Sequence, residues 1–331
     1  MRNAADRLPR VAIAVGDPAG IGPEISLKAA LAREVTTICR PLIVGDPGVL
    51  ERCARACGLA APLRLRAAAQ EADWSGGALQ VLAVPVPEGA GVAFGIMDVA
   101  NGHAALASAR AAIRVALEGG VEAVVAAPHN QTAIAAAGIA FDGYPGFVAR
   151  ETGTPANDVF LMLCFGGRRI VHCTLHVSVI DAVAMITREH VRRAIRATDA
   201  ALRRLGIPAP KIFVSGLNPH AGEGGLFGRE EIDVIAPAIA ALRDEIDVQG
   251  PFGCDTMFAK PGGDAFIVML HDQGHIPAKL AATSGSAALA IGTPVVFSSV
   301  AHGSAYDIAG KGIADPAALI AALRVVTGHH L

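Results

Sequence analysis

Short apolar runs rich in β-branched residues alternate along the whole chain with longer stretches that have helical spacing. Runs that predict strands in the first half are VAIAVG (11–16), PLIVGD (41–46), LQVLAV (79–84) and VEAVVAAP (121–128). Runs that predict strands in the second half are RRIVHCTLH (168–176), KIFVSG (211–216), AFIVMLH, which ends at His271, and PVVFSSV (294–300). Residues 101–119 and 179–204 have the spacing of helices, and the pair Gly119-Gly120 is typical of a helix end. This alternation predicts an α/β protein with a largely parallel sheet.

Composition narrows the class of protein. A chain of 331 residues has the length of roughly two ordinary domains, and its 52% hydrophobic content is enough for a sizeable core. A net charge of −2 argues against nucleic acid or an anionic membrane as the main partner, because both require a concentrated basic face. The uncharged run from Leu280 to Tyr306 is interrupted by glycine and proline, so we expect core strands there and no membrane span.

The cysteines and the N-terminus bear on the compartment. The 6 cysteines are scattered without a CxxC pair, as in a reduced cytosolic protein. The first ten residues, MRNAADRLPR, lack the apolar stretch of a signal peptide. We therefore expect a cytoplasmic protein.

Chemistry in a parallel α/β protein is expected beyond the carboxyl ends of the strands. GDPAGIGPE (16–24) follows the first strand, and its glycines would let backbone N–H groups approach an anion at a helix N-terminus. A plain strand-to-helix turn explains the same glycines equally well, and the segment is not GxGxxG.

Three histidines follow three predicted strands in the same way. His176 ends TLH, His220 lies in NPHAGEGG (218–225), and His271 begins HDQGHIP (271–277). One such histidine is more often structural than a ligand. Three at matching strand ends predict one divalent metal ion, with zinc as the expected metal and an open position left for substrate.

Two further residues near His271 have two interpretations each. His275 is close enough to His271 to support a metal ligand, or it is structural. Lys279 is a solvated lysine, or its apolar flanks make it a partly buried lysine with an anionic partner.

Two of these loops resemble one superfamily. GDPAGIGPE resembles the GDGIGPE of isocitrate- and isopropylmalate-type β-decarboxylating dehydrogenases, and HGSAYDIAGKGIADP (302–316) resembles their nicotinamide-dinucleotide loop, HGSAPDIAGKGIANP. The resemblance implies NAD as a cofactor. It places the cofactor on the residues Gly303, Ser304, Asp307, Ile308 and Asp315. The loop has no arginine for a 2′-phosphate, which favours NAD over NADP, although Lys311 is close enough to meet one.

Other segments narrow the resemblance. NPHAGEGG, HDQG followed by a lysine, and AGIAFDG (137–143) together resemble the 4-hydroxythreonine-4-phosphate dehydrogenase family over essentially the whole chain. By position, His176, His220 and His271 match its metal histidines. Lys279 matches a catalytic and substrate-binding lysine, and Asp255 matches a catalytic acidic residue near the metal.

The resemblance also implies an architecture. It implies two α/β/α domains with a cleft between them, as in isocitrate and isopropylmalate dehydrogenases, and a homodimer whose subunits share each site. Residues 1–127 plus 278–331 would form the cofactor-side domain, and 128–277 the domain with the metal histidines and the dimer interface.

The departures from this family concern the substrate. GYPG (143–146) stands where the phosphate-binding enzymes read GHTE, so Tyr144 and Pro145 replace histidine and threonine, and PHNQ (128–131) replaces PVHK. Phe297 and Ala288 occupy the places of a substrate-binding arginine and asparagine. A phosphate is normally held by such charge-assisted donors, each contributing about 1.5–3 kcal/mol. The altered residues resemble the terephthalate cis-dihydrodiol dehydrogenase branch, in which Tyr144 and Phe297 would give the pocket aromatic walls.

The sequence therefore predicts an NAD- and metal-dependent dehydrogenase that converts the small molecule terephthalate cis-dihydrodiol to protocatechuate and CO₂. The alternative is a dehydrogenase of 4-hydroxythreonine 4-phosphate or a phosphorylated sugar acid. A phosphate acetyltransferase-like acyltransferase is a remote alternative, and a non-catalytic nucleotide sensor would require that the three histidines do not converge.

Overall fold

A computed structural model describes residues 8–75, 77–86, 92–281 and 286–329. Residues 1–7 lie outside these ranges, and so does most of the N-terminal segment in which no signal-peptide pattern was found. The chain divides into two compact units, and the first combines residues up to Thr152 with Pro294–His329. The second unit spans Gly153–Thr293.

This division differs from the expected domain boundaries at two segments. Residues 128–152 group with the first unit because helices α5 (Gln131–Ala136) and α6 (Tyr144–Thr152) pack against α4 (Val99–Leu117). Residues 278–293 group with the second unit, where β11 (Ala287–Ile291) pairs with β6 (Phe160–Phe165).

The first unit is built on a parallel sheet with the strand order β3-β4-β2-β1-β5-β12. Its strands are β1 (Arg10–Ala14), β2 (Arg40–Gly45), β3 (Leu63–Arg66), β4 (Leu79–Ala83), β5 (Ala123–Ala126) and β12 (Phe297–Val300). Residues Val11–Ala14 of β1 are completely buried. Such an uninterrupted apolar run is typical of a parallel strand covered on both faces.

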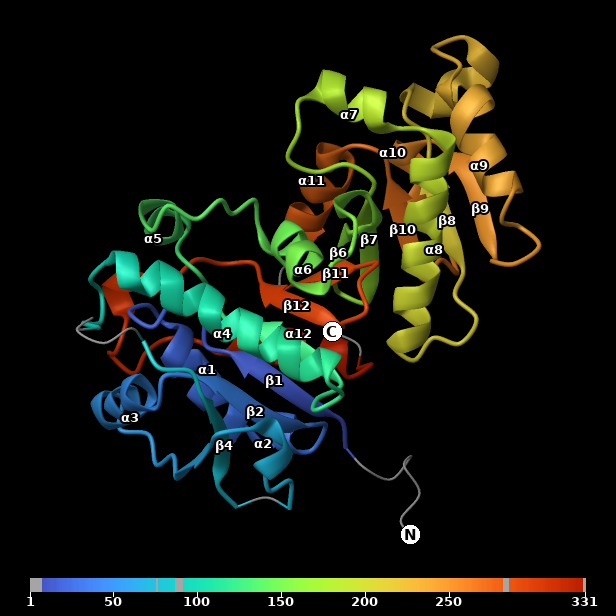
Figure 1. Ribbon diagram of the computed structural model, residues 1–331. Helices are drawn as coiled ribbons and strands as arrows, with labels where there is room; N and C mark the ends of the chain where they lie inside the picture. The colour runs from blue at the N-terminus through green and yellow to red at the C-terminus, as the bar shows by residue number, and fades with distance from the viewer. Residues whose placement is uncertain (1–7, 76, 87–91, 282–285, 330–331) are drawn as a thin grey trace. The chain divides into compact units, whose positions relative to one another are not determined.

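Helices of the first unit begin where the sequence supplies a cap or a proline. Asp98 caps α4, Asp46 caps α3 (Pro47–Ala56), and Pro23 lies in the first turn of α1 (Gly22–Leu31). The remaining helical segments are α2 (Arg33–Thr36), α12 (Ala317–Val326) and the short turns η2 (Ala69–Glu71) and η6 (Tyr306–Ile308). Helices α1 and α12 pack together, and α4 lies across β1, β2 and β5 (Figure 1).

The second unit has a mixed sheet with the strand order β11-β6-β7-β10-β8-β9. Its other strands are β7 (Arg168–His172), β8 (Ile212–Ser215), β9 (Val248–Phe252) and β10 (Ala265–Val268). β6 runs antiparallel to both of its neighbours, while β7, β10, β8 and β9 run parallel. The expected largely parallel α/β architecture is confirmed, with β6 as the exception.

One helix expected in this unit is two helices. The predicted 179–204 helix is broken into α7 (Val179–Met185) and α8 (Arg188–Arg204). Thr187 has extended backbone and its hydroxyl accepts a hydrogen bond from the N–H of His190, so it caps a new helix. The other helical segments are α9 (Ala236–Ala240), α10 (Cys254–Met257), α11 (His271–Ala281), η3 (Ala156–Asp158), η4 (Pro219–Gly225) and η5 (Glu231–Ile235).

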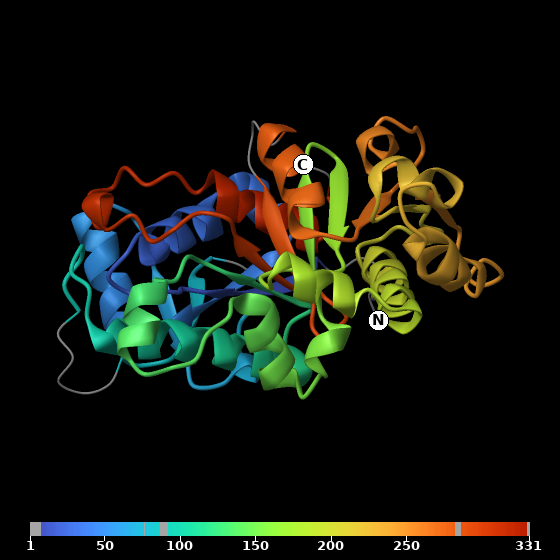
Figure 2. The ribbon, with the colours of Figure 1, turned by 90° about the horizontal axis from the view of Figure 1, so that it is seen from above.

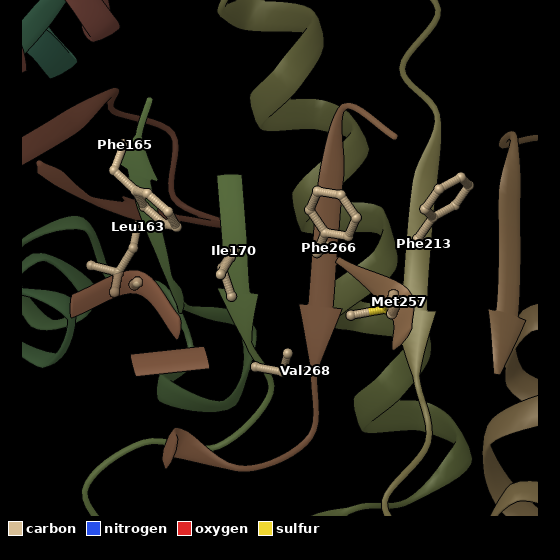
Figure 3. Close-up of a cluster of buried hydrophobic side chains, with 8 residues drawn as sticks. Leu163, Phe165, Ile170, Phe213, Met257, Phe266 and Val268 are labelled. Atoms are coloured by element: carbon tan, nitrogen blue, oxygen red, sulfur yellow. The ribbon is translucent and has the colours of Figure 1, made fainter. Parts of the chain in front are cut away.

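The core of the second unit lies on one face of its sheet. Figure 3 shows side chains from neighbouring strands β7, β10 and β8, with Met257 of α10 among them. The buried cluster consists of Leu163, Phe165, Ile170, Phe213, Met257, Phe266, Val268 and Ala278. Over the described ranges, no helix is long and apolar enough to cross a membrane.

Candidate functional site

The three histidine loops of the second unit lie at the carboxyl ends of neighbouring strands. His176 follows β7, His271 follows β10, and His220 follows β8. β10 pairs in parallel with both β7 and β8, so the three loops leave the same edge of the sheet. The expected placement of these loops is confirmed.

Polar side chains connect these loops to one another. The Thr174 hydroxyl donates to the carbonyl of Met269 at 2.7 Å, which joins the end of β7 to the end of β10. The side-chain oxygen of Gln273 accepts from the N–H groups of Met269 and Leu270, at 3.0 and 2.9 Å. Its amide donates to the Gly216 carbonyl at 3.3 Å, so Gln273 also holds the start of the His220 loop.

The His220 loop has an unusual backbone. Residues 220–224 all have positive φ, and three of them, His220, Ala221 and Glu223, are not glycine. Glu231, only 3% exposed, fixes the start of the loop, because its carboxylate accepts from the N–H groups of Leu217 and Asn218 at 2.7 and 2.8 Å. The sequence interpretation missed this role of Glu231, since nothing in its local pattern indicates it.

One histidine that was not expected there, His172, joins His176 and His275 near His271, with 6.2 Å between the His172 and His271 ring centroids. The rings of His271 and His275 stack at 3.8 Å between centroids, and the His176 ring is 5.6 Å from His271. Nδ1 of His275 lies 3.0 Å from Nε2 of His172, a buried residue that the sequence interpretation did not single out. Burial, together with the neighbouring imidazoles, lowers the pKa of His172 to about 3 and that of His275 to about 4. Both rings are therefore neutral at pH 7.

The expected metal ligands fit a divalent ion in chemistry but not in position. Nδ1 of His220 lies 3.9 Å from a carboxylate oxygen of Asp255, so these two predicted residues do come together. Among the residues that the structure describes, however, no three His, Cys, Asp or Glu side chains are placed to hold one metal ion. The metal assignment of His176, His220 and His271 thus stays a prediction.

Lys279 is more exposed than its neighbours in the sequence suggest. It is exposed on α11, with Ile276 and Leu280 54% and 79% exposed beside it. The idea of a partly buried lysine is wrong, because α11 buries only Gly274 and Ala278. The ammonium nevertheless contributes to the lowered pKa of His275, four residues earlier on the same helix face.

The loop 302–315 of the first unit is fastened to α1. The Glu24 carboxylate is completely buried and accepts from the N–H groups of Gly312 and Ala314, at 3.2 and 2.8 Å. Nζ of Lys28 donates to Glu24 and to the carbonyls of the same two loop residues, at 2.7–2.9 Å. Figure 2 shows this red segment running beside the blue helix α1.

Residues of this loop that were expected to bind NAD have different surroundings. The Ser304 hydroxyl is buried without a hydrogen-bond partner, and Asp307 and Gly303 are exposed, while Ile308 is half-buried. Asp315 accepts from the N–H of Ala317 at the start of α12. The unpartnered Ser304 hydroxyl fits a bound polar group.

The GDPAGIGPE loop packs directly against other backbone segments. A side chain at Gly16 would meet the Pro128 carbonyl at 2.3 Å, and one at Gly20 would meet Ser304 at 2.7 Å. These glycines thus allow close packing, which favours the plain turn over an anion cradle. The completely buried Asp17 accepts from the Tyr306 hydroxyl at 2.5 Å, and burial raises the pKa of this carboxyl.

Tyr144 and Phe297 are part of a buried aromatic cluster. Their ring centroids are 5.0 Å apart, and they are 6% and 1% exposed. His129 and Phe141 complete the cluster with edge contacts to Tyr144 at 4.8 and 5.7 Å. In the described structure these rings form core, and they do not present an open wall.

The other two residues at altered positions belong to different units. Pro145, half-buried, follows Tyr144 in α6. Ala288 lies on β11 of the second unit, opposite Leu163, and packs against that unit's core.

Comparison with known proteins identifies the family. The family model described as "Pyridoxal phosphate biosynthetic protein PdxA" matches residues 37–326. The chain belongs to the PdxA family. It is 43% identical to the 1,2-dihydroxy-3,5-cyclohexadiene-1,4-dicarboxylate dehydrogenase of Comamonas sp., over 94% of this chain and 95% of that protein.

Other PdxA-family comparisons agree over the whole length. The D-threonate 4-phosphate dehydrogenase of Cupriavidus necator is 40% identical over 97% of each chain. The crystal structure of a terephthalate 1,2-cis-dihydrodiol dehydrogenase from Burkholderia xenovorans is similar with a TM-score of 0.76 and 47% identity, covering 97% of this chain and 98% of that one. The chain is therefore a PdxA-family dehydrogenase by sequence and fold.

Proposed function

We propose that the chain oxidises terephthalate cis-dihydrodiol with NAD and that the resulting β-keto acid loses CO₂ to give protocatechuate. The observation that carries the proposal is the buried contact between Phe297 and Tyr144, 5.0 Å between ring centroids. The family resemblance places a substrate-binding arginine at position 297, one of the donors that would hold a phosphate. An apolar ring that is 1% exposed offers no positive charge there, which supports a substrate without phosphate.

NAD would be held by the loop after β12. The unpartnered Ser304 hydroxyl would donate a hydrogen bond to the cofactor, and Asp307 would accept one from a ribose hydroxyl. The backbone at Gly303 and Ile308 would lie close to the cofactor. Asp315 is less suited to this role, because one of its oxygens already accepts from Ala317. In that position NAD would supply the acceptor for the hydride that leaves the carbon bearing the secondary hydroxyl.

The α11 face would bind and deprotonate the substrate. Lys279 is exposed and would bind a carboxylate of the dicarboxylic acid. His275 lies one helix turn before Lys279 in α11. It is uncharged because its pKa is lowered to about 4, and it would receive the proton of the substrate hydroxyl. Loss of CO₂ from the β-keto acid then restores the aromatic ring, which makes the reaction favourable.

Binding of a divalent metal by His176, His220 and His271 is a separate prediction, and the roles proposed for Lys279 and His275 do not depend on it. Equilibrium dialysis of the purified chain against Zn²⁺ tests it directly. We expect one ion per chain, and none for His271→Ala or His220→Ala, with His103→Ala as the exposed control. Absence of bound zinc in the wild-type chain would show the metal prediction to be wrong.

The function is tested with the purified chain, NAD and three substrates: terephthalate cis-dihydrodiol, 4-hydroxythreonine 4-phosphate and D-threonate 4-phosphate. Formation of NADH and release of CO₂ are measured together. We expect both only with the dihydrodiol. Binding of NAD without turnover of any substrate would instead support a nucleotide sensor, and acyl transfer to phosphate would support the acyltransferase.

A phosphorylated hydroxy acid is the second candidate substrate. It is favoured by the 40% identity with the D-threonate 4-phosphate dehydrogenase over 97% of each chain. Turnover of either phosphorylated acid at a rate above that of the dihydrodiol would establish it and overturn the first proposal.

A further inference from the structure

A pocket of about 340 Å³ lies in the first unit, away from the cofactor loop. Its walls come from the end of α1, the first residues of β2 and β4, and the segment just before β4. The lining includes Leu31, Arg40, Pro41, Trp74 and Leu79. This volume is enough for a small-molecule ligand.

The pocket is at the opposite end of the strands from the proposed NAD loop and from the loop 16–24. β2 begins at Arg40 and β4 at Leu79, and both run parallel to β1 and β12. The loops 16–24 and 302–315 follow the carboxyl ends of β1 and β12. A six-residue strand such as β2 is roughly 20 Å long, so the pocket is not part of the cofactor site.

Arg40 gives the pocket a positive charge. One guanidinium nitrogen donates to the carbonyl of Thr36 at 2.7 Å, and this hydrogen bond orients the side chain. Because the carbonyl is neutral, the bond does not neutralise the charge of Arg40. Asp73 also lines the pocket, but its Oδ1 accepts from Ser75, and Arg64 and Arg66 both help to lower its pKa. The carboxylate of Asp73 is thus held mainly by Ser75, and Arg64 and Arg66 offset only part of its charge.

Trp74 gives the pocket a flat aromatic surface. The guanidinium carbon of Arg10 lies 5.7 Å from its ring centroid, and Arg10 is itself held by Glu122 at 2.6 Å. The indole is therefore oriented before any ligand arrives. Pro41, Leu79 and Pro62 supply apolar surface in the same lining.

We propose that this pocket binds a small aromatic carboxylate. The ring of the ligand packs against Trp74 and the prolines, and its carboxylate accepts hydrogen bonds from Arg40. The ligand is bound and not transformed, because the lining offers no hydride acceptor or proton-transfer pair. The proposal does not depend on the proposed dehydrogenase substrate.

Trp74 makes the test direct, because it is the only tryptophan in the chain. The probe is benzoate, titrated into the full chain while tryptophan emission is recorded. We expect a saturable change at millimolar concentration. Benzamide, which lacks the charge, and cyclohexanecarboxylate, which lacks the flat ring, should each bind about tenfold more weakly.

Variants locate the response. Arg40→Met should abolish the saturable change and Arg40→Lys should retain part of it, while NAD-dependent turnover stays at the wild-type level. Arg33→Met is the matched control, since Arg33 is exposed on α2 and does not line the pocket. Ala78→Leu, which fills the pocket and leaves Arg40 in place, should also abolish the change.

Three outcomes would overturn the proposal. They are no saturable change in the wild-type chain, an unchanged response in both Arg40→Met and Ala78→Leu, or equal affinity for benzoate and benzamide. If Arg40→Met did not fold, Ala78→Leu and the ligand series would still decide the question.

Discussion

His129 illustrates how surroundings set the charge of a single side chain. Its ring makes edge contacts with Phe141 and Tyr144, at 4.7 and 4.8 Å between centroids. Burial lowers its pKa to about 4, so the imidazole is neutral at physiological pH. A neutral ring belongs in an apolar cluster, and a charged one does not.

We expect stability to fall as the pH is lowered through this residue. The pKa is about 4 when folded and about 6.5 when unfolded, so between these values the unfolded chain binds more protons. The contribution, about 1–3 kcal/mol, is fully present above pH 6.5 and is lost as the pH falls toward 4. Urea unfolding of wild type and His129→Gln at several pH values measures it.

The comparison needs a histidine whose side chain is exposed to solvent. His103→Gln, on the exposed side of α4, should leave the pH dependence of the wild type unchanged. A His129→Gln curve parallel to that of the wild type would contradict the expectation.

The buried site of Phe297 should not tolerate a charge. Phe297→Arg places an unpaired charge at a site that is 1% exposed, and we expect a loss of at least about 3 kcal/mol in the free energy of unfolding. Turnover of the dihydrodiol should fall with it. Phe297→Leu keeps the site apolar and should cost only about 1–2 kcal/mol.

Chemical denaturation measures both variants. If Phe297→Arg were as stable as Phe297→Leu, the side chain would have another environment in solution, and the argument against a phosphorylated substrate would lose its basis.

At the scale of elements, α1 and the loop 302–315 act together. Glu24 and Lys28 lie one helix turn apart and bind the same two loop residues, Gly312 and Ala314, through N–H and carbonyl groups. The loop shape thus depends on a buried ion pair in another element, 2.8 Å between Nζ and Oε1.

Glu24→Gln should therefore loosen the loop. The amide cannot match the charge of Lys28, which is left partly buried and unpaired. We expect the KM for NAD to rise about tenfold or more with a smaller change in kcat, and faster hydrogen exchange in 302–315. Glu34→Gln, an exposed acid of α2, is the control. Unchanged exchange in the loop would argue against this prediction.

Sequence patterns predicted the elements whose signal is local. The buried strands β1, β2 and β5 and helix α4 lie within a few residues of the expected ranges. The antiparallel course of β6 was not predictable, because strand direction depends on distant partners. The break at Thr187 was missed because the hydrophobic spacing continues across it.

The same distinction applies to the candidate site. The placement of His176, His220 and His271 at one sheet edge was predicted from their positions just after strands of a parallel sheet, and the pairing of β10 with β7 and β8 agrees with it. The buried His172 beside His275 was missed, because a histidine inside a strand has no local signal of its partner. Lys279 was misjudged since apolar neighbours on a helix do not reveal which face is covered.

At the scale of the whole molecule, the four most exposed large apolar side chains of the described residues belong to the second unit. Ile180 and Val179 of α7 are 83% and 68% exposed, Leu226 beside the His220 loop is 73% exposed, and Leu280 of α11 is 79% exposed. Large apolar groups on a surface commonly mark an interface with another chain. They support the proposed homodimer.

Ile180→Asp should then weaken the dimer. A charge placed in an apolar interface costs several kcal/mol on association, so we expect the dimer to dissociate at micromolar concentration. Light scattering coupled to size exclusion measures the mass. Ile96→Asp is the control, because Ile96 is 61% exposed but belongs to the first unit. A monomeric wild-type chain would contradict the homodimer itself.

The backbone of the His220 loop has a consequence for attempts to improve the enzyme. His220, Ala221 and Glu223 have φ of 51, 53 and 45°, a conformation that costs an L-residue roughly 1 kcal/mol and glycine almost nothing. A screen for heat resistance would therefore favour glycine at these positions. At position 220 that gain would remove the imidazole that the predicted metal site requires, so thermostability and metal binding would be in direct competition at one residue.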